Sequence, residues 1–399
     1  MAVEAASVWN TSCVSCSLEF VGFRRNTNRI YKASSCLPNA AQRLLLCTQM
    51  SFNKTGIRRL KSMRLSDGFR LKCEAVYAEI PLQEKGVNIS KATLIWRAIK
   101  LPMYSVALIP LTVGSAVAYW QTGHCCAKRY LTLLVSSVLV IAWLNLSNDV
   151  HDFDKGADRN KKESVVNLVD SRTGTHIIAC FLLALGLIGL TRVSIEAGSL
   201  RSILLLVYAI FCGYIYQCPA FRLGYIGLGE SLCFAAFGPF ATTAFYLLQS
   251  GTSELAISVT SISSSLLVGF TTALILFCSH FHQVEDDKAV GKYSPSVNFG
   301  TEAGAKVVKM AVTSLCSLLF ALGLGQALPF SCVILGALTL PIGNLVSSFI
   351  EKNHYDISMI FMAKYYCVRL HTAFGVALAA GLVAARLFVR KQLPHAIII

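Results

Sequence analysis

Residues 131–174 read LTLLVSSVLVIAWLNLSNDVHDFDKGADRNKKESVVNLVDSRTG. The change from apolar to polar and charged residues at Asn145 decides how the chain is interpreted. The first fourteen residues are almost entirely apolar, as part of a membrane-spanning helix would be. The acidic cluster after them consists of Asn148, Asp149, Asp152, Asp154 and Asp158, followed by Arg159, Lys161 and Lys162. Carboxylates beside an apolar segment are costly unless they meet cations or water, and Mg²⁺ prefers oxygen ligands that it often shares with a diphosphate. We therefore expect a metal–diphosphate site at a membrane boundary. A solvated charged loop between two transmembrane helices has the same composition and stays open as the alternative.

The composition of the chain indicates a membrane protein with several spans. It has 399 residues, 54% of them hydrophobic and 14% charged, with a mean hydropathy of +0.57, whereas soluble domains carry about 25% charged residues. Of the net charge of +15, residues 1–72 hold +9, from 12 Lys and Arg against 3 Asp and Glu. The basic character belongs mostly to this arm, and we expect no nucleic-acid partner.

Fifteen cysteines are scattered along the chain, and the single C-x-x-C is Cys13 and Cys16. No second pair stands at zinc-ligand spacing, so we expect free thiols packed as small apolar groups rather than a disulfide framework.

The first 72 residues are rich in Ser, Arg, Asn and Cys, poor in acids, and lack a long apolar run. This pattern is typical of a chloroplast transit peptide, although a disordered cytosolic arm would look similar. We predict four parts, namely a disordered transit peptide at 1–72, a linker at 73–96, a transmembrane domain at 97–390 and a C-terminal tail at 391–399. A chloroplast membrane, thylakoid or inner envelope, is the expected location.

Nine apolar segments in the transmembrane domain reach spanning length. They are residues 101–120, 131–147, 175–192, 201–218, 228–249, 257–280, 306–325, 329–349 and 371–389. The predicted fold is therefore an all-α membrane protein, a bundle of about nine transmembrane helices with two Asp-rich loops on one side. Loops after the even-numbered segments hold about 12 Lys and Arg against about 4 in the others, so the positive-inside bias places the acidic loops on the stromal side.

The second acidic loop follows the sixth segment, in residues 279–304, SHFHQVEDDKAVGKYSPSVNFGTEAG. Glu285, Asp286 and Asp287 are consecutive, with Lys288 and Lys292 after them. Two such loops on one side of a membrane could hold two divalent ions on either flank of a diphosphate. If the sixth helix continued through the loop, Asp286 and Asp287 would each share a helix face with the residue four positions before them.

Two histidines, His280 and His282, precede these acids. They are compatible with a transition-metal site or with ordinary polar residues at a helix end, and the surrounding carboxylates favour a hard ion.

A third stretch, residues 208–230, surrounds Arg222 with aromatic residues and glycines. Candidate cavity residues here are Tyr208, Tyr214, Tyr216 and Glu230. The tyrosines could stabilise a cation through their ring faces or form an interfacial belt, and Glu230 could contact a substrate or interact with a helix dipole.

The two acidic motifs together resemble those of UbiA-type intramembrane aromatic prenyltransferases, and more narrowly those of the 1,4-dihydroxy-2-naphthoate prenyltransferases, which in plants use a phytyl donor. That branch reads N-D-x-x-D-x-x-x-G-x-D, matched here by Asn148, Asp149, Asp152, Gly156 and Asp158. The second motif ends in D-x-x-x-G-K, matched by Asp287, Gly291 and Lys292. The resemblance covers about residues 95–390. It departs at Gln283, where the family commonly has an acid, so the ligands of the second metal are less well defined than those of the first.

The resemblance implies prenyl transfer from a diphosphate to 1,4-dihydroxy-2-naphthoate with loss of the ring carboxylate, in phylloquinone biosynthesis. It also implies Mg²⁺, in two ions, bound by Asn148, Asp149, Asp152, Asp158, Glu285, Asp286 and Asp287. The residues expected to contact the diphosphate are Lys161, Lys162, Arg222 and Lys292. No catalytic base is identifiable from the sequence. The alternatives are a prenyltransferase of the same fold with homogentisate or a chlorophyllide as acceptor, and a membrane transporter.

Overall fold

The computed structural model describes residues 18–19, 32–33, 100–156, 164–251 and 256–392. The chain divides into two units, residues 1–88 and 89–399. In the first unit, the strands β1 (Leu18–Glu19) and β2 (Lys32–Ala33) pair antiparallel. Apart from these two strands, the predicted transit peptide lies outside the described residues, as do the predicted linker and most of the predicted tail.

In the second unit, all described regular structure is helical. The long helices are α3 (Ser105–Thr122), α4 (Ala127–Lys155), α6 (Arg172–Ala197), α7 (Leu200–Gln217), α10 (Val259–Ser279), α12 (Pro295–Leu324), α14 (Leu340–Asn353) and α16 (Ala363–Gln392). The shorter ones are η1 (Leu101–Tyr104), α5 (Val165–Val169), η2 (Leu223–Ile226), α8 (Gly229–Ala235), the π-helix η3 (Ala236–Thr242), α9 (Thr243–Ser250), η4 (Phe281–Gln283), α11 (Val284–Ala289), α13 (Phe330–Ala337) and α15 (Ile357–Ile360).

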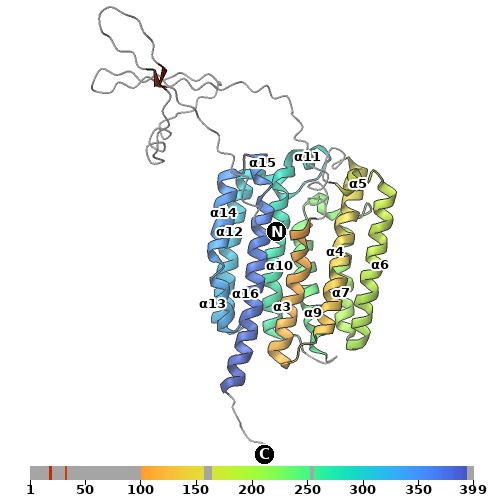
Figure 1. Cartoon of the computed structure of the whole chain (residues 1–399), viewed down its shortest axis with the longest axis vertical. Helices are drawn as coiled ribbons and strands as arrows, with labels where there is room; N and C mark the ends of the chain where they lie inside the picture. Colours follow the sequence, from red (N-terminus) through yellow and green to blue (C-terminus); the bar gives the residue numbers. More distant parts are fainter. Residues whose placement is uncertain (1–17, 20–31, 34–99, 157–163, 252–255, 393–399) are drawn as a thin grey trace, which may run out of the picture. The chain divides into compact units, whose positions relative to one another are not determined.

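These helices form a bundle with the predicted number of membrane spans. Among the described residues, eight helical segments are long and apolar enough to cross a membrane, or nine if α13 and α14, bent by 42°, form one span. Each of the nine predicted segments coincides with one of them, so the predicted all-α membrane bundle is confirmed. Figure 1 shows the long helices side by side, with the short helices α5, α11 and α15 gathered at one end.

The first acidic motif is helical, where the sequence had suggested a loop. Helix α4 runs eight residues past the predicted end at 147, to Lys155, and stops at Gly156, whose φ of 90° is a left-handed conformation that glycine adopts without strain. The second motif, in contrast, does not continue its helix: α10 ends at Ser279, and η4 and α11 follow as separate short turns.

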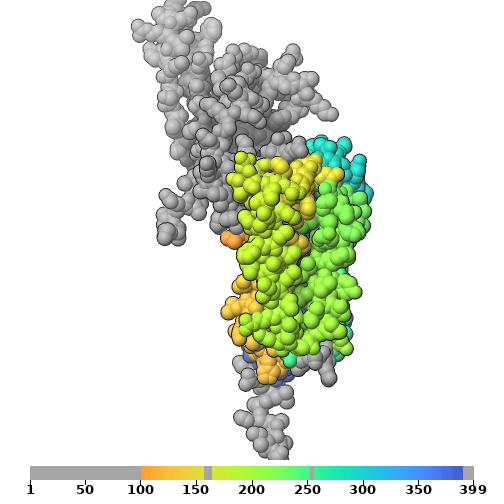
Figure 2. Space-filling view, turned by 90° about the vertical axis from the view of Figure 1, so that its right-hand side faces the viewer, coloured from red at the N-terminus to blue at the C-terminus, as the bar shows by residue number. Residues whose placement is uncertain are grey.

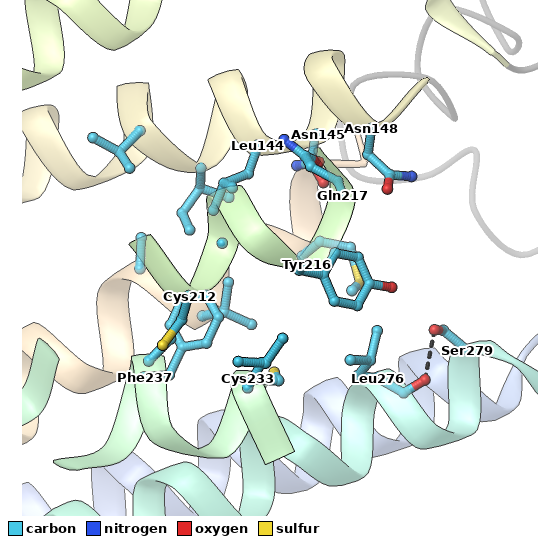
Figure 3. A pocket seen from close by; sticks show the side chains of 18 of the residues that line it. Leu144, Asn145, Asn148, Cys212, Tyr216, Gln217, Cys233, Phe237, Leu276 and Ser279 are labelled. Atoms are coloured by element: carbon cyan, nitrogen blue, oxygen red, sulfur yellow. Dashed lines mark hydrogen bonds between the residues drawn. The ribbon is translucent and has the colours of Figure 1, made fainter. Parts of the chain in front are cut away.

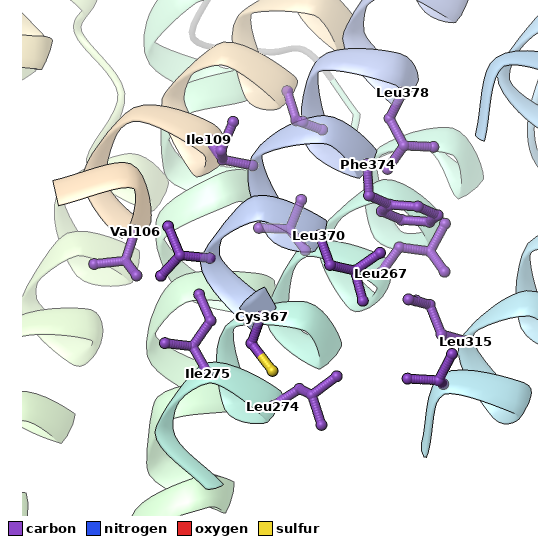
Figure 4. Close-up of a cluster of buried hydrophobic side chains, with 14 of the residues drawn as sticks. Val106, Ile109, Leu267, Leu274, Ile275, Leu315, Cys367, Leu370, Phe374 and Leu378 are labelled. Atoms are coloured by element: carbon purple, nitrogen blue, oxygen red, sulfur yellow. The ribbon is translucent and has the colours of Figure 1, made fainter. Parts of the chain in front are cut away.

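Helix α10 lies at the centre of the bundle, where it contacts α3, α8, η3, α12 and α16. Figure 4 shows its Leu267, Leu274 and Ile275 meeting apolar side chains of α3, α12 and α16. Close crossing of α10 with α8 and η3 depends on two glycines, Gly238 and Gly269. A Cβ added at Gly238 would come within 2.6 Å of the Ser265 carbonyl of α10, and one at Gly269 within 2.6 Å of the Phe234 carbonyl of α8. Small residues let membrane helices approach in this way.

Helices α6 and α7 present an apolar surface to the outside of the bundle, and Figure 2 looks onto this face. Phe181, Ile188 and Ile195 on α6 and Leu204 and Val207 on α7 are all exposed. In a membrane-spanning chain such a surface is in contact with lipid.

Candidate functional site

A cavity of about 320 Å³ opens inside the bundle, between α3, α4, α7, α8, η3, α10 and the start of α16. Apart from Ser137 inside α4, its polar lining comes from near the ends of helices: Lys100, Asn145, Asn148, Asp152, Tyr216, Gln217, Ser279, His280, His282, Gln283, Lys292, Lys364 and Tyr365. Its apolar lining comes from helix interiors, including Ile141, Leu206, Ile210, Phe237 and Phe245. Figure 3 shows Asn148, Gln217 and Tyr216 at one end, and Cys212 and Phe237 away from it. One wall of the cavity therefore suits a charged group and the other an apolar chain.

The last turns of α4 hold the first motif at the polar end. Asn148 and Asp152 lie four residues apart and so share one helix face, and Asn148 Nδ2 donates to Asp152 Oδ2 at 2.8 Å. Asp149 faces another way: its Oδ1 pairs with Lys100 Nζ at 2.9 Å, and its Oδ2 accepts from the Val165 backbone N–H at 3.3 Å. Both carboxylates are buried, and Asp152 with Asn148 lines the cavity.

The segment between α7 and α8 joins the two acidic motifs. The Tyr225 hydroxyl donates to Asp152 Oδ1 at 2.8 Å, and the Tyr225 carbonyl accepts from the Tyr293 N–H, just after the second motif, at 2.7 Å. Burial, and then the negative charge of Asp152, raise the pKa of the Tyr225 hydroxyl, so it remains a donor at neutral pH.

Glycines in this segment make room for Tyr216. A Cβ at Gly224 or Gly229 would come within 2.7 or 2.8 Å of the Tyr216 ring, whose face these glycines cover. The tyrosine is thereby fixed on the cavity wall. Arg222 has a φ of 45° and its guanidinium carbon lies 5.6 Å from the centre of the Tyr225 ring. It is not among the residues that line the cavity.

The second motif contributes one carboxylate and one ammonium at the same end. Asp287 Oδ1 pairs with Lys292 Nζ at 3.3 Å, both side chains are less than 10% exposed, and the Lys292 N–H donates to the Asp287 carbonyl at 2.8 Å. Burial by itself lowers the pKa of Lys292, but the acidic groups around it, Tyr216, Asp287 and Asp152 foremost, outweigh burial and raise it. Asp152 and Lys292 both line the cavity, and the Tyr225 ring, whose hydroxyl bonds Asp152, has its centre 5.7 Å from Lys292 Nζ, so the two motifs meet at Tyr225.

The other two acids of the second motif point elsewhere. Glu285 and Asp286 are exposed on α11, whereas Asp287 is buried. None of these three acids is among the residues that line the cavity, whereas Gln283 lines it. Because the helix breaks after α10, Asp286 does not share a face with the cavity-lining His282, as a continuous helix would have required. Of the three consecutive acids, only Asp287 has a buried side chain.

The remaining predicted residues are distributed as follows. Tyr208 and Tyr214 are 52% and 44% exposed on α7 and are absent from the cavity lining, while Tyr216 lines it. Glu230 reaches the cavity wall through His280, whose Nδ1 lies 3.1 Å from Glu230 Oε1. The predicted site residues Asp158, Lys161 and Lys162 lie outside the described residues.

Sequence reasoning missed Lys100, Lys364 and Tyr225. The two lysines line the polar end of the cavity from positions just before α3 and at the start of α16. A usable signal existed, because both precede apolar segments that begin on the side of the acidic motifs. Tyr225 carries no comparable signal, since its role depends on the fold of the segment around it.

The donor set at this end suits a hard cation. Within the described residues, no group of three or more His, Cys, Asp or Glu side chains is placed to hold a metal ion. Asp152 nevertheless lines the cavity, and the buried Asp287, which does not line it, pairs with the cavity-lining Lys292. Asp287 Oδ2 has no hydrogen-bond partner among the described groups. An ionised carboxylate oxygen is an acceptor only, and oxygen ligands are what Mg²⁺ prefers. The residues present therefore fit Mg²⁺.

Comparison with known proteins places these features in context. Residues 107–368 match the UbiA prenyltransferase family. The chain is 65% identical over 302 residues to the chloroplastic 2-carboxy-1,4-naphthoquinone phytyltransferase of Arabidopsis thaliana, covering 75% of this chain and 79% of that protein. It is 44% identical over 285 residues to the 2-carboxy-1,4-naphthoquinone phytyltransferase of Synechocystis, covering 71% and 91%. A solved UbiA homologue from Archaeoglobus fulgidus, bound to GPP and Mg²⁺, aligns with 73% of this chain and 100% of its own at 17% identity and a TM-score of 0.46.

Proposed function

Because the chain belongs to the UbiA prenyltransferase family, we propose that it transfers a phytyl group from its diphosphate to 1,4-dihydroxy-2-naphthoate, with loss of the ring carboxylate as CO₂. Family membership makes the chain an enzyme and removes the transporter alternative. The observation that carries the choice of substrates is the identity of 65% and 44% to two enzymes whose names specify a phytyl donor and a carboxylated naphthoquinone acceptor.

The acceptor enters this proposal in its reduced form. The relatives' names give 2-carboxy-1,4-naphthoquinone, which differs from 1,4-dihydroxy-2-naphthoate by two electrons and two protons. Transfer is redox-neutral for either, since the electron pair left behind by the departing CO₂ replaces, in the overall balance, the pair that forms the new ring bond. The dihydroxy form has the more electron-rich ring and therefore reacts more readily with an allylic cation.

The cavity accommodates both ends of such a donor. Ile141, Leu206, Ile210 and Phe237 provide an apolar wall for the prenyl chain, which is as hydrophobic as the lipid around the bundle. At the polar end, the buried Lys292 ammonium is positioned to contact a diphosphate as a point charge. Lys161, Lys162 and Arg222 are proposed as further diphosphate contacts.

The chemistry then follows from what these residues hold and exclude. The carbon–oxygen bond of the donor breaks as the diphosphate departs, and the apolar wall keeps water from the allylic cation until the ring attacks it. Bound Mg²⁺ would supply charge neutralisation for the leaving diphosphate. Its proposed ligands, in two sites, are Asn148, Asp149, Asp152 and Asp158, and Glu285, Asp286 and Asp287.

We place this activity in phylloquinone biosynthesis in a chloroplast membrane, with residues 1–72 as a transit peptide and the acidic motifs facing the stroma. The chloroplastic relative, the composition of the arm and the distribution of Lys and Arg among the loops support this placement.

The test is a transfer assay with the purified protein in detergent, given phytyl diphosphate, 1,4-dihydroxy-2-naphthoate and Mg²⁺. We expect a demethyl-phylloquinol product that disappears with EDTA, returns with added Mg²⁺, and is lost in Asp149→Ala and Asp287→Ala. Glu196→Ala, an exposed acid near the far end of α6, is the control and retains activity. Product with homogentisate or a chlorophyllide alone would overturn the acceptor, and a folded protein that transfers to no acceptor would overturn the proposed function.

A further inference from the structure

His280 and Glu230 form a pair on the cavity wall that is separate from the carboxylates and lysines already assigned. His280 follows the last residue of α10 and Glu230 lies in the first turn of α8. Their atoms Nδ1 and Oε1 are 3.1 Å apart, and the side chains are 3% and 17% exposed. His280 itself lines the cavity and Glu230 does not. The carboxylate thus stands behind the imidazole as seen from the cavity.

This arrangement determines which ring nitrogen is available. An ionised carboxylate can only accept a hydrogen bond, so next to it the neutral imidazole of His280 carries its proton on Nδ1 and keeps a lone pair on Nε2. Within the described residues, no hydrogen bond to Nε2 is formed, and Glu230 Oε2 is buried without a partner. A histidine oriented by a carboxylate in this way is a common form of general base.

The neighbourhood of the pair joins the two halves of the cavity. Leu276, Leu232 and Cys233, from the same two helices, line the apolar wall beside it. The titratable groups that face the pair are Tyr216 from the end of α7, Cys233 from α8, Asp287 from α11, and Lys292, which is paired with Asp287. An aromatic ring placed here would have the diphosphate end on one side and the prenyl chain on the other.

A purely structural role accounts for the pair less well. A histidine at a helix C-terminus usually contacts the last carbonyl groups of its own helix, whereas the ring of His280 bonds a carboxylate on another helix. The other role considered for this histidine is that of a transition-metal ligand. Such a site requires further ligands, and the described His, Cys, Asp and Glu side chains form no metal-binding group of three or more.

We infer that Nε2 of His280 accepts the proton of a ring hydroxyl of the acceptor while the new bond forms, and that Glu230 is the residue that positions it. The inference rests on the proposed function and adds the base that the sequence did not identify. The electron pair of the O–H bond moves into the ring, whose carboxylate-bearing carbon bonds to C1 of the prenyl group as the diphosphate leaves with its own electron pair. The carbon–carboxylate bond then breaks, CO₂ departs, and the electron pair returns to the ring oxygen, which takes the proton back from His280.

The experiment compares three single variants of the full chain in detergent, together with the double variant His280→Gln/Glu230→Gln. His280→Gln keeps a side chain that can bond Glu230 but has no basic nitrogen, and Glu230→Gln keeps the shape without the charge. His354→Gln is the matched control, because His354 is also a buried histidine at a helix end but bonds Thr301 and does not line the cavity. Initial rates are measured from pH 7 to pH 10, with thermal unfolding of each variant.

At pH 7 we expect His280→Gln to lower kcat by about 100-fold or more, with KM for phytyl diphosphate within about twofold of wild type. We expect the loss of kcat in His280→Gln to become smaller toward pH 10. There a phenolic hydroxyl of pKa about 10 ionises in solution, so its proton no longer has to be removed by a base. Because Glu230 acts through His280, the losses of the two variants do not multiply in the double variant. A structural defect would lower the rate equally at both pH values.

The inference is overturned if kcat of His280→Gln stays within about threefold of wild type, if its loss is the same at pH 7 and pH 10, or if the losses multiply. Should His280→Gln unfold, Glu230→Gln carries the same pH comparison. If the wild-type protein transfers the prenyl group and His280→Gln does so at the same rate, this inference fails and the proposed function stands. If the wild-type protein transfers it to no phenolic acceptor, the proposed function fails as well.

Discussion

Removal of the Tyr225 hydroxyl tests whether the segment between α7 and α8 organises the site. In Tyr225→Phe, Asp152 loses the 2.8 Å bond to its Oδ1 and keeps only the Asn148 amide on Oδ2. A hydrogen bond to a charged group contributes about 1.5–3 kcal/mol, which corresponds to a rate loss of about 10- to 150-fold if it is felt in the transition state. The raised pKa of the Tyr225 hydroxyl means that wild type keeps this donor throughout the neutral range.

The assay for this prediction is the rate of prenyl transfer as a function of Mg²⁺ concentration, with thermal unfolding measured in parallel. We expect a lower maximal rate and a higher Mg²⁺ requirement, because Asp152 is less firmly oriented. Tyr293→Phe is the matched control, since Tyr293 contributes a backbone N–H to the same segment while its side chain is 54% exposed. Activity and Mg²⁺ dependence like those of wild type in Tyr225→Phe would refute the reasoning.

Three further predictions concern the second motif and the packing of the bundle. Lys292→Met should lower transfer by about 100-fold or more, by removing the buried cation and leaving Asp287 unpaired; a rise limited to the KM of the naphthoate would contradict a diphosphate role. Asp287→Asn should lose far more activity than Asp286→Asn, because only Asp287 is buried beside the cavity, and equal losses in the same assay would contradict this ranking. Gly238→Val should destabilise the fold by about 1–3 kcal/mol through overpacking against Ser265, which thermal unfolding in detergent would detect; an unchanged unfolding temperature would show that α10 and η3 can separate without cost.

The transmembrane organisation was predictable because hydropathy and length are properties of consecutive residues. Each apolar run of spanning length is helical, in one helix or in consecutive helices, since backbone groups in lipid must bond within their own segment. The acidic motifs were found for the same reason, as their charges stand beside apolar runs. The sequence did not reveal that Asn148–Lys155 continues α4, because polar helical turns and a charged loop have similar compositions. The stop signal, Gly156, comes about two and a half turns after the predicted end at 147.

What the tertiary structure alone decided is which of these polar groups face one another. Glu285, Asp286 and Asp287 are consecutive, yet the break after Ser279 rotates α11 so that only Asp287 is buried next to Lys292. The pairing of Tyr225 with Asp152 joins residues 73 positions apart, and that of His280 with Glu230 joins residues 50 apart. Such contacts depend on the rotation and crossing of whole helices, which close packing at positions such as Gly238 and Gly269 determines. The sequence by itself thus determined the spans and the kind of chemistry at their ends, whereas helix packing determined the site.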